Sequence, residues 1–487
     1  MPVKLIEMNS ARGEAPPAPN TGGVRESLPR GLALLVAASM FMEILDETVI
    51  APALPQIAAD FGVRAVSVNL AITAYVLAVA LLIPVSGWLS GRFGARAVFT
   101  TAVAVFTLAS LGCAAAASLP MLTATRVLQG VGGALMVPVG RLTVLRTTAK
   151  SDLIRAIAYM TWPALVAPVL APAVGGVLTT YAHWRWIFLL NVPLGVGVLL
   201  LARRLVPEVR EPSGGELDWR GLGLTTVGVG GVVVAMEAAG SAASPPVTAG
   251  ALGVGLLALA AAIRYLLRSR RPLLRLRLFA VPTFRVTAAG GSVFRAAIAA
   301  VPFLLPLLFQ LGFGWTAAHA GLVVIALFLG NLAIKPLTTP LMRRFGIRPV
   351  LLGAITASAV ALVGVGLVQA HTPLPLLLAL LVLSGAFRSI GFSAYNTVAF
   401  ADISAEQLNA ANTLLASVQQ VGGGLGIATS ALVVAVGGPL VDLTGLGTGA
   451  GGPVRIALLF LALMLVIPAI EAFRLPRDAG HHVTGPS

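Results

Sequence analysis

Residues 97–117 read AVFTTAVAVFTLASLGCAAAA, a run that contains no charged side chain. The hydrocarbon core of a lipid bilayer is about 30 Å thick, and an α-helix needs about 20 consecutive apolar residues to cross it. This stretch has the length and the composition of one membrane-spanning helix.

The same pattern extends outward along the chain, from Gly31 to Phe473. Of the 487 residues, 57% are hydrophobic and 10% are charged, whereas soluble domains have roughly 45–50% and about 25%. No soluble fold needs this imbalance, so we expect an all-α integral membrane protein. Apolar runs bounded by charged residues, Gly or Pro predict fourteen helices, at residues 33–57, 65–86, 97–117, 121–143, 153–181, 186–206, 219–239, 247–267, 282–311, 317–341, 349–370, 374–400, 408–436 and 453–473.

The basic residues orient these helices. The net charge is +15, and 27 of the 33 Lys and Arg residues fall on one side of the membrane if the helices alternate in direction. They lie in the N-terminal tail, near residues 92–96, 141–155, 203–220, 264–285 and 335–348, and after residue 473. Cytoplasmic loops are enriched in Lys and Arg. We therefore expect a multi-pass protein of the inner (cytoplasmic) membrane with both termini cytoplasmic, and no nucleic-acid partner.

The ends of the chain and its cysteine content add little chemistry. Residues 1–30 are rich in Pro, Gly and Ala and resemble a disordered cytoplasmic tail rather than a signal peptide. The single cysteine, Cys113, lies in an apolar run. It predicts a small packing residue and excludes a disulfide framework or a thiolate metal cluster.

A short repeat indicates a duplicated architecture. Arg92-Phe93-Gly94-Ala95-Arg96 recurs 252 residues later as Arg344-Phe345-Gly346-Ile347-Arg348, at the same topological position. Parallel six-helix repeats with a central binding site are a known transporter plan. We therefore expect fourteen helices arranged as 6+2+6, with six-helix bundles at 31–206 and 282–474, two inserted helices within 207–281, and a cytoplasmic tail at 475–487.

The first predicted helix carries three carboxylates, Glu43, Asp46 and Glu47. Their spacing of i, i+3 and i+4 places them on one side of a helix. An ionised side chain at the membrane centre costs about 2.5–3.5 kcal/mol on insertion scales, so the cluster requires a reason. Crowded carboxyl groups titrate as a coupled set and can carry a proton or bind a cation. Alternatively, Glu43 or Glu47 pairs with a buried arginine, or the cluster lies nearer the external interface.

Three arginines also fall inside apolar runs, Arg126, Arg295 and Arg388, and could balance the three acids. Arg126 lies in a glycine-rich run that allows close helix approach. Arg295 and Arg388 could pair with the acids, bind an anionic substrate or reach an interface. In the predicted helix 153–181, Pro163, Pro168 and Pro172 with Gly175 and Gly176 predict a bent, tightly packed helix.

Together these residues resemble the major facilitator superfamily, specifically its fourteen-helix drug/proton antiporter branch. The stretch from Leu45 to Pro55 is similar to that branch's first-helix signature, in which the residue at Asp46 is tied to proton coupling. Arg126 with Gln129 and Gly130 matches a fourth-helix motif linked to proton transfer. Residues 168–176 match the antiporter motif of the fifth helix, and residues 184–193 match a further hallmark.

The resemblance also identifies residues 87–96 as the loop motif that forms a cytoplasmic gate. An acid usually stands where this chain has Gly91, and glycines usually stand at Ala167 and Ala171. Arg295 and Arg388 match no motif of the family. The expected gating residues are Gly87, Arg92, Gly94, Arg96, Pro168, Pro172, Gly175 and Gly176.

Further polar side chains in the apolar runs are candidates for a substrate cavity, although each could instead hydrogen-bond between helices. The expected proton-coupling residues are Glu43, Asp46, Glu47 and Arg126. The expected substrate-binding residues are Glu43, Glu47, Gln129, Arg295, Gln310, Asn331, Arg388, Tyr395, Asn396, Gln419 and Gln420.

The sequence thus predicts a proton-driven antiporter that exports amphipathic cationic or neutral compounds by alternating access. The alternative is a transporter of an anionic or metabolite-like solute recognised by Arg295 and Arg388. All five histidines fall in loops or the tail, and no zinc or nucleophile motif is present, so an enzyme is not expected. The proton gradient would be the energy source, without cofactor or metal. The expected partners are the bilayer, protons and substrate, with a periplasmic adaptor as a further candidate, and the protein is expected to be a monomer.

Overall fold

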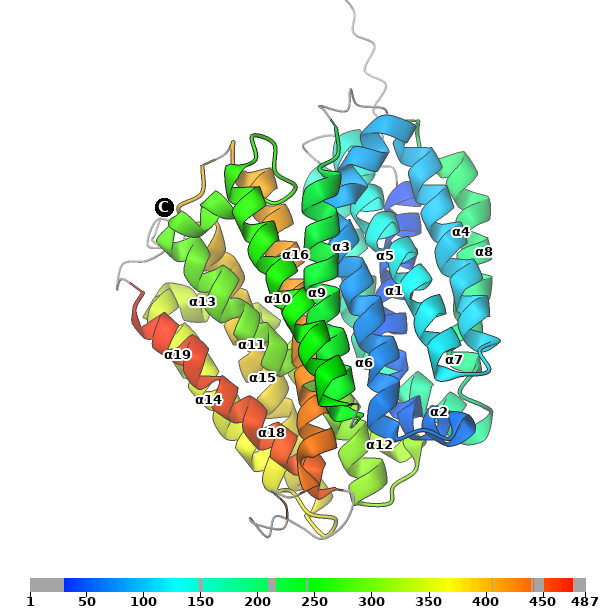
Figure 1. Ribbon diagram of the computed structural model, residues 1–487, viewed down its shortest axis with the longest axis vertical. Coiled ribbons are helices and arrows are strands. Elements are labelled where there is room, and N and C mark those ends of the chain that lie inside the picture. Colours follow the sequence, from blue (N-terminus) through cyan, green and yellow to red (C-terminus); the bar gives the residue numbers. More distant parts are fainter. Residues whose placement is uncertain are drawn as a thin grey trace, which may run out of the picture.

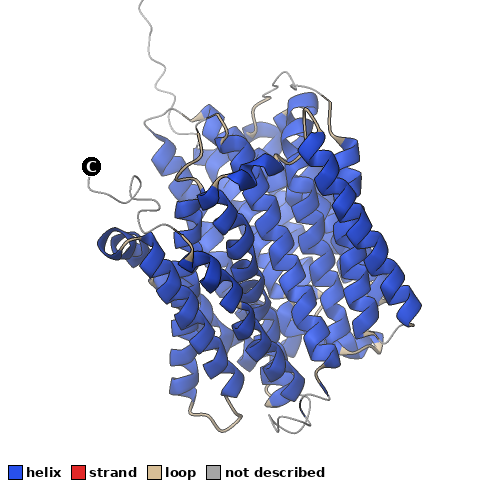
Figure 2. Cartoon of the chain, turned by 60° about the vertical axis from the view of Figure 1, so that its left-hand side comes forward, coloured by secondary structure: helices blue, strands red, loops and turns tan. Residues whose placement is uncertain are grey.

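The structure, a computed structural model, describes residues 30–148, 152–208, 216–241, 244–404, 406–438, 441 and 451–475. In this part of the chain, the secondary structure is entirely helical (Figure 2). Long helices run side by side and are joined by short connections, as the apolar runs predicted.

The N-terminal helices pack into one bundle, seen on the right of Figure 1. Short helices α2 (Leu54–Phe61) and α7 (Trp186–Leu189) lie at its lower end in that view. The long helices are α1 (Arg30–Val49), α3 (Asn69–Phe93), α4 (Ala95–Ala114), α5 (Leu119–Thr147), α6 (Leu153–Tyr181) and α8 (Asn191–Leu205). We call this group the N-terminal bundle.

The C-terminal helices form a second bundle, on the left of Figure 1. It consists of α11 (Pro282–Leu307), α12 (Ala317–Ala333), α13 (Lys335–Phe345), α14 (Ile347–Leu367), α15 (Leu374–Ala399), α16 (Leu408–Val436), α18 (Gly452–Met464) and α19 (Val466–Phe473). The two bundles meet where α3 packs on α16 and where α6 packs on α12.

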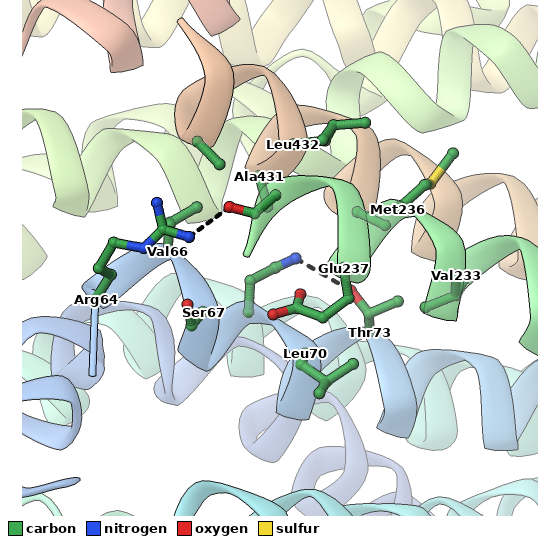
Figure 3. Close-up of a pocket in the computed structure, with 14 residues that line it drawn as sticks. Arg64, Val66, Ser67, Leu70, Thr73, Val233, Met236, Glu237, Ala431 and Leu432 are labelled. Carbon is green, nitrogen blue, oxygen red and sulfur yellow. Dashed lines mark hydrogen bonds between the residues drawn. The ribbon is translucent and has the colours of Figure 1, made fainter. Parts of the chain in front are cut away.

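Between the bundles in the chain lies a hairpin of α9 (Trp219–Gly240) and α10 (Pro245–Arg268). Its two helices approach closely where Gly231 of α9 meets Gly255 of α10. A Cβ atom added to Gly231 would lie only 2.8 Å from the Cα of Gly255. Helix α9 packs on α16 and α3, at the seam between the bundles. Figure 3 shows this contact, where Arg64 donates a hydrogen bond to the carbonyl of Gly240 and Glu237 points from α9 toward α3.

Twelve of the described helices are long and apolar enough to cross a membrane. The pair α12 and α13 adds a thirteenth if it counts as one span bent by 47°. Helix α1 has 20 residues but carries Glu43, Asp46 and Glu47 within its length. By length and composition, the structure therefore gives twelve or thirteen spans rather than the predicted fourteen.

Several predicted helices are interrupted in the structure. The predicted helix 33–57 ends as α1 at Val49 and continues as a 3₁₀ turn and α2, because Pro52 and Pro55 cannot donate backbone hydrogen bonds. The predicted helix 317–341 breaks at Ile334, just before Pro336. By contrast, α6 and α16 have the predicted bounds, 153–181 and 408–436.

The repeated five-residue sequences make the same contacts in the two bundles. Gly94 and Gly346 have φ of 88° and 82°, a region open to glycine but strained for other residues. Arg96 Nε donates to the carbonyl of Val206, just beyond α8, and Arg348 Nη2 donates to the carbonyl of Phe473, at the end of α19. Each repeat thus ties the start of one helix to the last helix of its bundle.

These repeats mark what we call the arginine-rich end of the molecule. At the opposite end, Trp184 and Arg185 hold α2 in place. Trp184 Nε1 and Arg185 Nη1 donate hydrogen bonds to Asp60 Oδ2 over 2.7 and 2.9 Å. The Trp184 hydrogen bond, with smaller contributions from Arg185 and His183, holds the pKa of the Asp60 carboxyl below its usual range.

At this opposite end the bundles are in close contact. Gln310 Nε2 donates to the carbonyl of Pro52 over 3.0 Å, and Ala318 N donates to Thr180 Oγ1 over 2.9 Å. The backbones of α6 and α12 touch where the two helices cross. A Cβ atom added to Gly176 would lie only 2.3 Å from the carbonyl oxygen of Ala317. The interface is therefore closed at the end away from the arginines.

We expect Gly176→Val to force this closed end apart, because the added side chain has no room against the α12 backbone. Overpacking typically costs ~1–3 kcal/mol. Spin labels on Ala59→Cys in α2 and Leu322→Cys in α12 should report a longer distance in the variant, measured by electron–electron double resonance. The control is Gly197→Val, since no atom lies within 4 Å of a Cβ there. Unchanged distances in both variants would contradict the closure.

Candidate functional site

A buried ion pair lies inside the N-terminal bundle. Arg126 Nη1 of α5 donates a hydrogen bond to Asp46 Oδ2 of α1, and neither side chain is exposed. Gln129 Nε2 and Asn191 Nδ2 donate to the other oxygen, Asp46 Oδ1, over 2.8 and 2.6 Å. Arg126 also donates to Gln129 Oε1 over 2.8 Å. The Asp46 carboxylate therefore accepts charge-assisted hydrogen bonds from two other helices of the bundle.

The surroundings of the pair hold it away from water. The guanidinium of Arg126 lies 4.1 Å from the ring centroid of Tyr75 and 5.8 Å from that of Phe188. Gly130 brings α5 against α3, since a Cβ there would lie 2.7 Å from the carbonyl of Tyr75. Ser110 of α4 accepts a hydrogen bond from Gln129 over 2.7 Å. Residues of α1, α3, α4, α5, α7 and α8 thus surround one acid and one base.

The two glutamates of α1 point elsewhere. Glu43 faces α5. A Cβ atom added to Gly133 of α5 would lie 3.3 Å from Glu43 Oε1. Glu47 lines a cavity between the bundles, where it interacts electrostatically with Arg295 and accepts a hydrogen bond from the side chain of Gln420, which is not a lining residue. Glu43 and Asp46 therefore both face α5 inside the N-terminal bundle, whereas Glu47 faces the cavity.

The cavity between the bundles has a volume of about 600 Å³, within the ~300–1,000 Å³ typical of ligand sites. Its apolar wall includes Met40 and Ile44 of α1 and Phe303 and Phe328 of the C-terminal bundle. It extends from Ala51, near the closed end, to Arg141 and Ile157 toward the arginine-rich end. A cavity closed at one end and reaching toward the other is what a transporter in one of its two states requires.

Five of the predicted site residues line this cavity: Glu47, Pro168, Arg295, Asn331 and Arg388.

Other predicted residues lie elsewhere. Gln129 belongs to the Asp46 pair, Gln310 bonds to Pro52, and Asn396 Nδ2 donates to the carbonyl of Phe392 in its own helix. Tyr395 packs inside the C-terminal bundle, with its ring centroid 5.7 Å from that of Phe294. Gln419, half-buried on α16, is not a lining residue.

The predicted gating residues occupy both ends of the interface region. At the arginine-rich end, Arg92 lies over the rings of Trp88 and Phe93, Gly94 breaks the helix, and a Cβ on Gly87 would meet nothing within 4 Å. At the closed end, a Cβ atom added to Gly175 of α6 would lie 2.2 Å from the carbonyl oxygen of Val49 in α1. A Cβ atom added to Gly321 of α12 would lie 2.1 Å from the carbonyl oxygen of Pro172 in α6. The small residues of α6 are therefore needed for its contacts with α1 and α12.

Some residues of these sites had no predicted role. Asn191 was within the hallmark stretch 184–193, but nothing in the sequence showed that its amide would reach Asp46. Arg141 and Lys335 were counted among the basic residues of one membrane face, yet both line the cavity. In the described residues, no group of three His, Cys, Asp or Glu side chains could hold a metal ion.

Comparison with known proteins identifies the family. The family model described as Major Facilitator Superfamily matches residues 36–298 and 287–486. The chain belongs to the major facilitator superfamily. Relatives of this superfamily member include "Putative multidrug resistance protein MdtD" of Cronobacter sakazakii, 36% identical over 91% of this chain and 94% of that protein. "Probable transport protein HsrA" of Haemophilus influenzae is 36% identical over 83% of this chain and 88% of that protein.

Solved structures of other transporters show the same fold. The D-xylose–proton symporter superposes with a TM-score of 0.68 at 16% identity, over 93% of this chain and 99% of that one. An inward-facing, unoccupied bacterial homologue of the human lysosomal transporter Spinster gives a TM-score of 0.65 at 17% identity, over 92% and 97%. The described part of this major facilitator protein therefore has the helical fold of these two transporters.

We expect the Asp46–Arg126 pair to be strongly coupled in stability. Removing one partner of a buried pair costs about 3–5 kcal/mol because the other charge remains buried and unpaired. Arg126→Gln should therefore lower the unfolding midpoint in detergent. The double variant with Asp46→Asn should lose much less free energy of unfolding than the two single variants lose in sum.

The control cycle uses Asp152 and Arg155, a partly exposed pair 3.9 Å apart, for which about 0–1 kcal/mol is expected. Equal coupling energies in the two cycles would contradict the structural importance of the buried pair.

Proposed function

We propose that this transporter is a proton-driven antiporter that exports amphipathic compounds by alternating access between its two bundles. One observation carries the proposal. Helix α1 contains Asp46, a fully buried carboxylate that is paired with an arginine. The next residue of the same helix, Glu47, lines the central cavity. Ionisable residues at membrane depth are costly and typically form proton relays.

We further propose that α1 and the bent pair α12–α13 each cross the membrane, which gives fourteen crossings arranged as 6+2+6. Cytoplasmic segments are enriched in Lys and Arg, so the arginine-rich end faces the cytoplasm in this proposal. The cavity is then closed toward the outside and extends toward the cytoplasm, the state in which an exporter takes up its substrate.

Proton transfer in this proposal acts through the hydrogen bonds of Asp46. An ionised Asp46 accepts from Arg126, Gln129 and Asn191. A proton on Asp46 removes the charge that holds Arg126, so the contacts among α1, α5 and α8 weaken together. Helix α1 leads directly into the turn whose Pro52 accepts from Gln310 at the closed end. Protonation of Asp46 and opening of that end are thus linked through one helix.

The comparisons support the export of amphipathic compounds. Relatives that are 34–36% identical carry the name multidrug resistance protein, and the apolar wall of the cavity suits an amphipathic body. The preference for cationic or neutral compounds rested on three acids in α1. Only Glu47 of these acids lines the cavity, so the acids give less support to a cationic substrate than their spacing indicated.

The test of this proposal is transport in proteoliposomes with an imposed pH gradient, assayed separately with an amphipathic fluorescent cation and an amphipathic fluorescent anion. Asp46→Asn should abolish proton-driven accumulation, because the variant has no carboxylate to protonate, but should retain exchange of substrate across the membrane without a gradient. The matched control is Asp152→Asn, in the partly exposed pair with Arg155, which should transport normally. Gradient-driven accumulation at the wild-type rate in Asp46→Asn would refute the role of Asp46, and no transport of either dye by the wild type would refute the function.

A further inference from the structure

The charged side chains that line the central cavity are unequal in sign. Four are basic, Arg141, Arg295, Lys335 and Arg388, and one is acidic, Glu47. Both intramembrane arginines of the C-terminal bundle are among them. Arg126, the third intramembrane arginine, is already paired with Asp46 and lies outside the cavity. The charge balance between acids and arginines that the sequence allowed therefore holds for the Asp46–Arg126 pair but not in the cavity.

Arg388 is the least satisfied of these groups. Its side chain projects from α15, the residue is 9% exposed, and its buried Nη1 has no hydrogen-bond partner in the described protein. Leaving a buried charge without a partner is among the costliest arrangements in a folded protein. A guanidinium that lines a cavity in this state is a ready donor for a ligand.

Arg295 of α11 lies near Arg388 and is close enough for the two like charges to interact. Its guanidinium lies 5.2 Å from the ring centroid of Phe392, and its buried Nε also has no partner in the described protein. Glu47 interacts with Arg295 from the facing bundle. Even if that interaction satisfies Arg295, Arg388 is left without a counter-charge among the lining residues.

We propose that the central cavity binds an amphipathic organic anion, with its acid group between Arg295 and Arg388 and its apolar body against the cavity wall. The proposal rests on the transport function above and names the class of its substrate. Arginine presents a planar fork of donors that matches a carboxylate, sulfonate or phosphate oxygen pair. Both arginines line the cavity, and their guanidinium groups are the donors available for it.

The wall of the cavity defines the rest of the ligand. Phe303, Phe328, Met40 and Ile44 are apolar and come from both bundles, so a bare inorganic anion would leave most of this surface without a partner. Lys335 and Arg141 lie toward the arginine-rich end. They place further positive charge along the route by which an anion would enter.

The experiment compares three probes of one shape, 2-naphthoate, the neutral 2-naphthamide and the cationic 2-naphthylmethylammonium. Binding is measured by isothermal titration to the purified full-length protein in detergent, without a proton gradient. Hydrogen bonds to charged groups contribute about 1.5–3 kcal/mol, so 2-naphthoate should bind ~10-fold or more tightly than 2-naphthamide. Arg388→Gln and Arg295→Gln should each remove most of this preference and leave the affinity for 2-naphthamide nearly unchanged.

Two further variants keep the result interpretable. Arg388→Lys retains the positive charge without the fork, and should bind 2-naphthoate with an affinity between those of the wild type and Arg388→Gln. Arg455→Gln removes an arginine of α18 that donates to the carbonyl of Val368 and does not line the cavity, and should behave as the wild type. Unfolding midpoints of all variants establish that each is folded.

Any one of four results would overturn the proposal. The ammonium probe could bind more tightly than 2-naphthoate, or 2-naphthoate and 2-naphthamide could bind equally. No probe could bind to folded protein, or Arg455→Gln could lose as much of the preference as the cavity variants. Failure of the transport function has a different signature. In that case 2-naphthoate binds with the predicted dependence on Arg295 and Arg388, but no gradient-driven movement of either dye occurs in proteoliposomes.

Discussion

The Asp46–Arg126 ion pair is the interaction on which the rest of the structure depends. Two charges are enclosed at membrane depth, where neither could remain alone without a large desolvation cost. The pair is completed by Gln129 and Asn191, so it joins α1 to α5 and α8, and Ser110 brings in α4. The N-terminal bundle is therefore organised around a polar centre that joins four of its helices. Any change in the charge of Asp46 alters that arrangement, which makes the pair a natural control element for movement between the two bundles.

The two bundles use their buried charges differently. In the N-terminal bundle the arginine is matched by a carboxylate and is kept from the cavity. In the C-terminal bundle Arg295 and Arg388 face the cavity, and only Glu47 approaches them from the other side. The proposed proton site and the proposed substrate site are thus separate in space but adjacent in the chain, since Asp46 and Glu47 are consecutive residues of α1. A helix that carries one residue of each site can couple them without any direct contact between proton and substrate.

Much of the fold could be predicted because a membrane helix is recognisable from length and composition alone. The bounds of α6 and α16 followed directly from their apolar runs, and the repeat at residues 92–96 and 344–348 makes equivalent contacts in both bundles. The breaks after Val49 and at Ile334 were missed, although Pro52 and Pro336 were visible. The partner of each acid could not be predicted, because successive residues of a helix point about 100° apart. Asp46 and Glu47 therefore face different neighbours, and only packing decides which. Lys335 and Arg141 were assigned to a membrane face, since sequence position does not show how deep a cavity reaches.

The most direct test of this account is whether the Asp46 carboxyl takes up a proton when the reconstituted protein is moved from high to low pH. Infrared difference spectroscopy detects the carbonyl stretch of a protonated carboxylic acid. The account predicts that one component of this band, present in the wild type and in Glu43→Gln, is missing from Asp46→Asn. If the Asp46→Asn spectrum matched that of the wild type across the pH range in which transport occurs, the buried pair would not be the proton-coupling element.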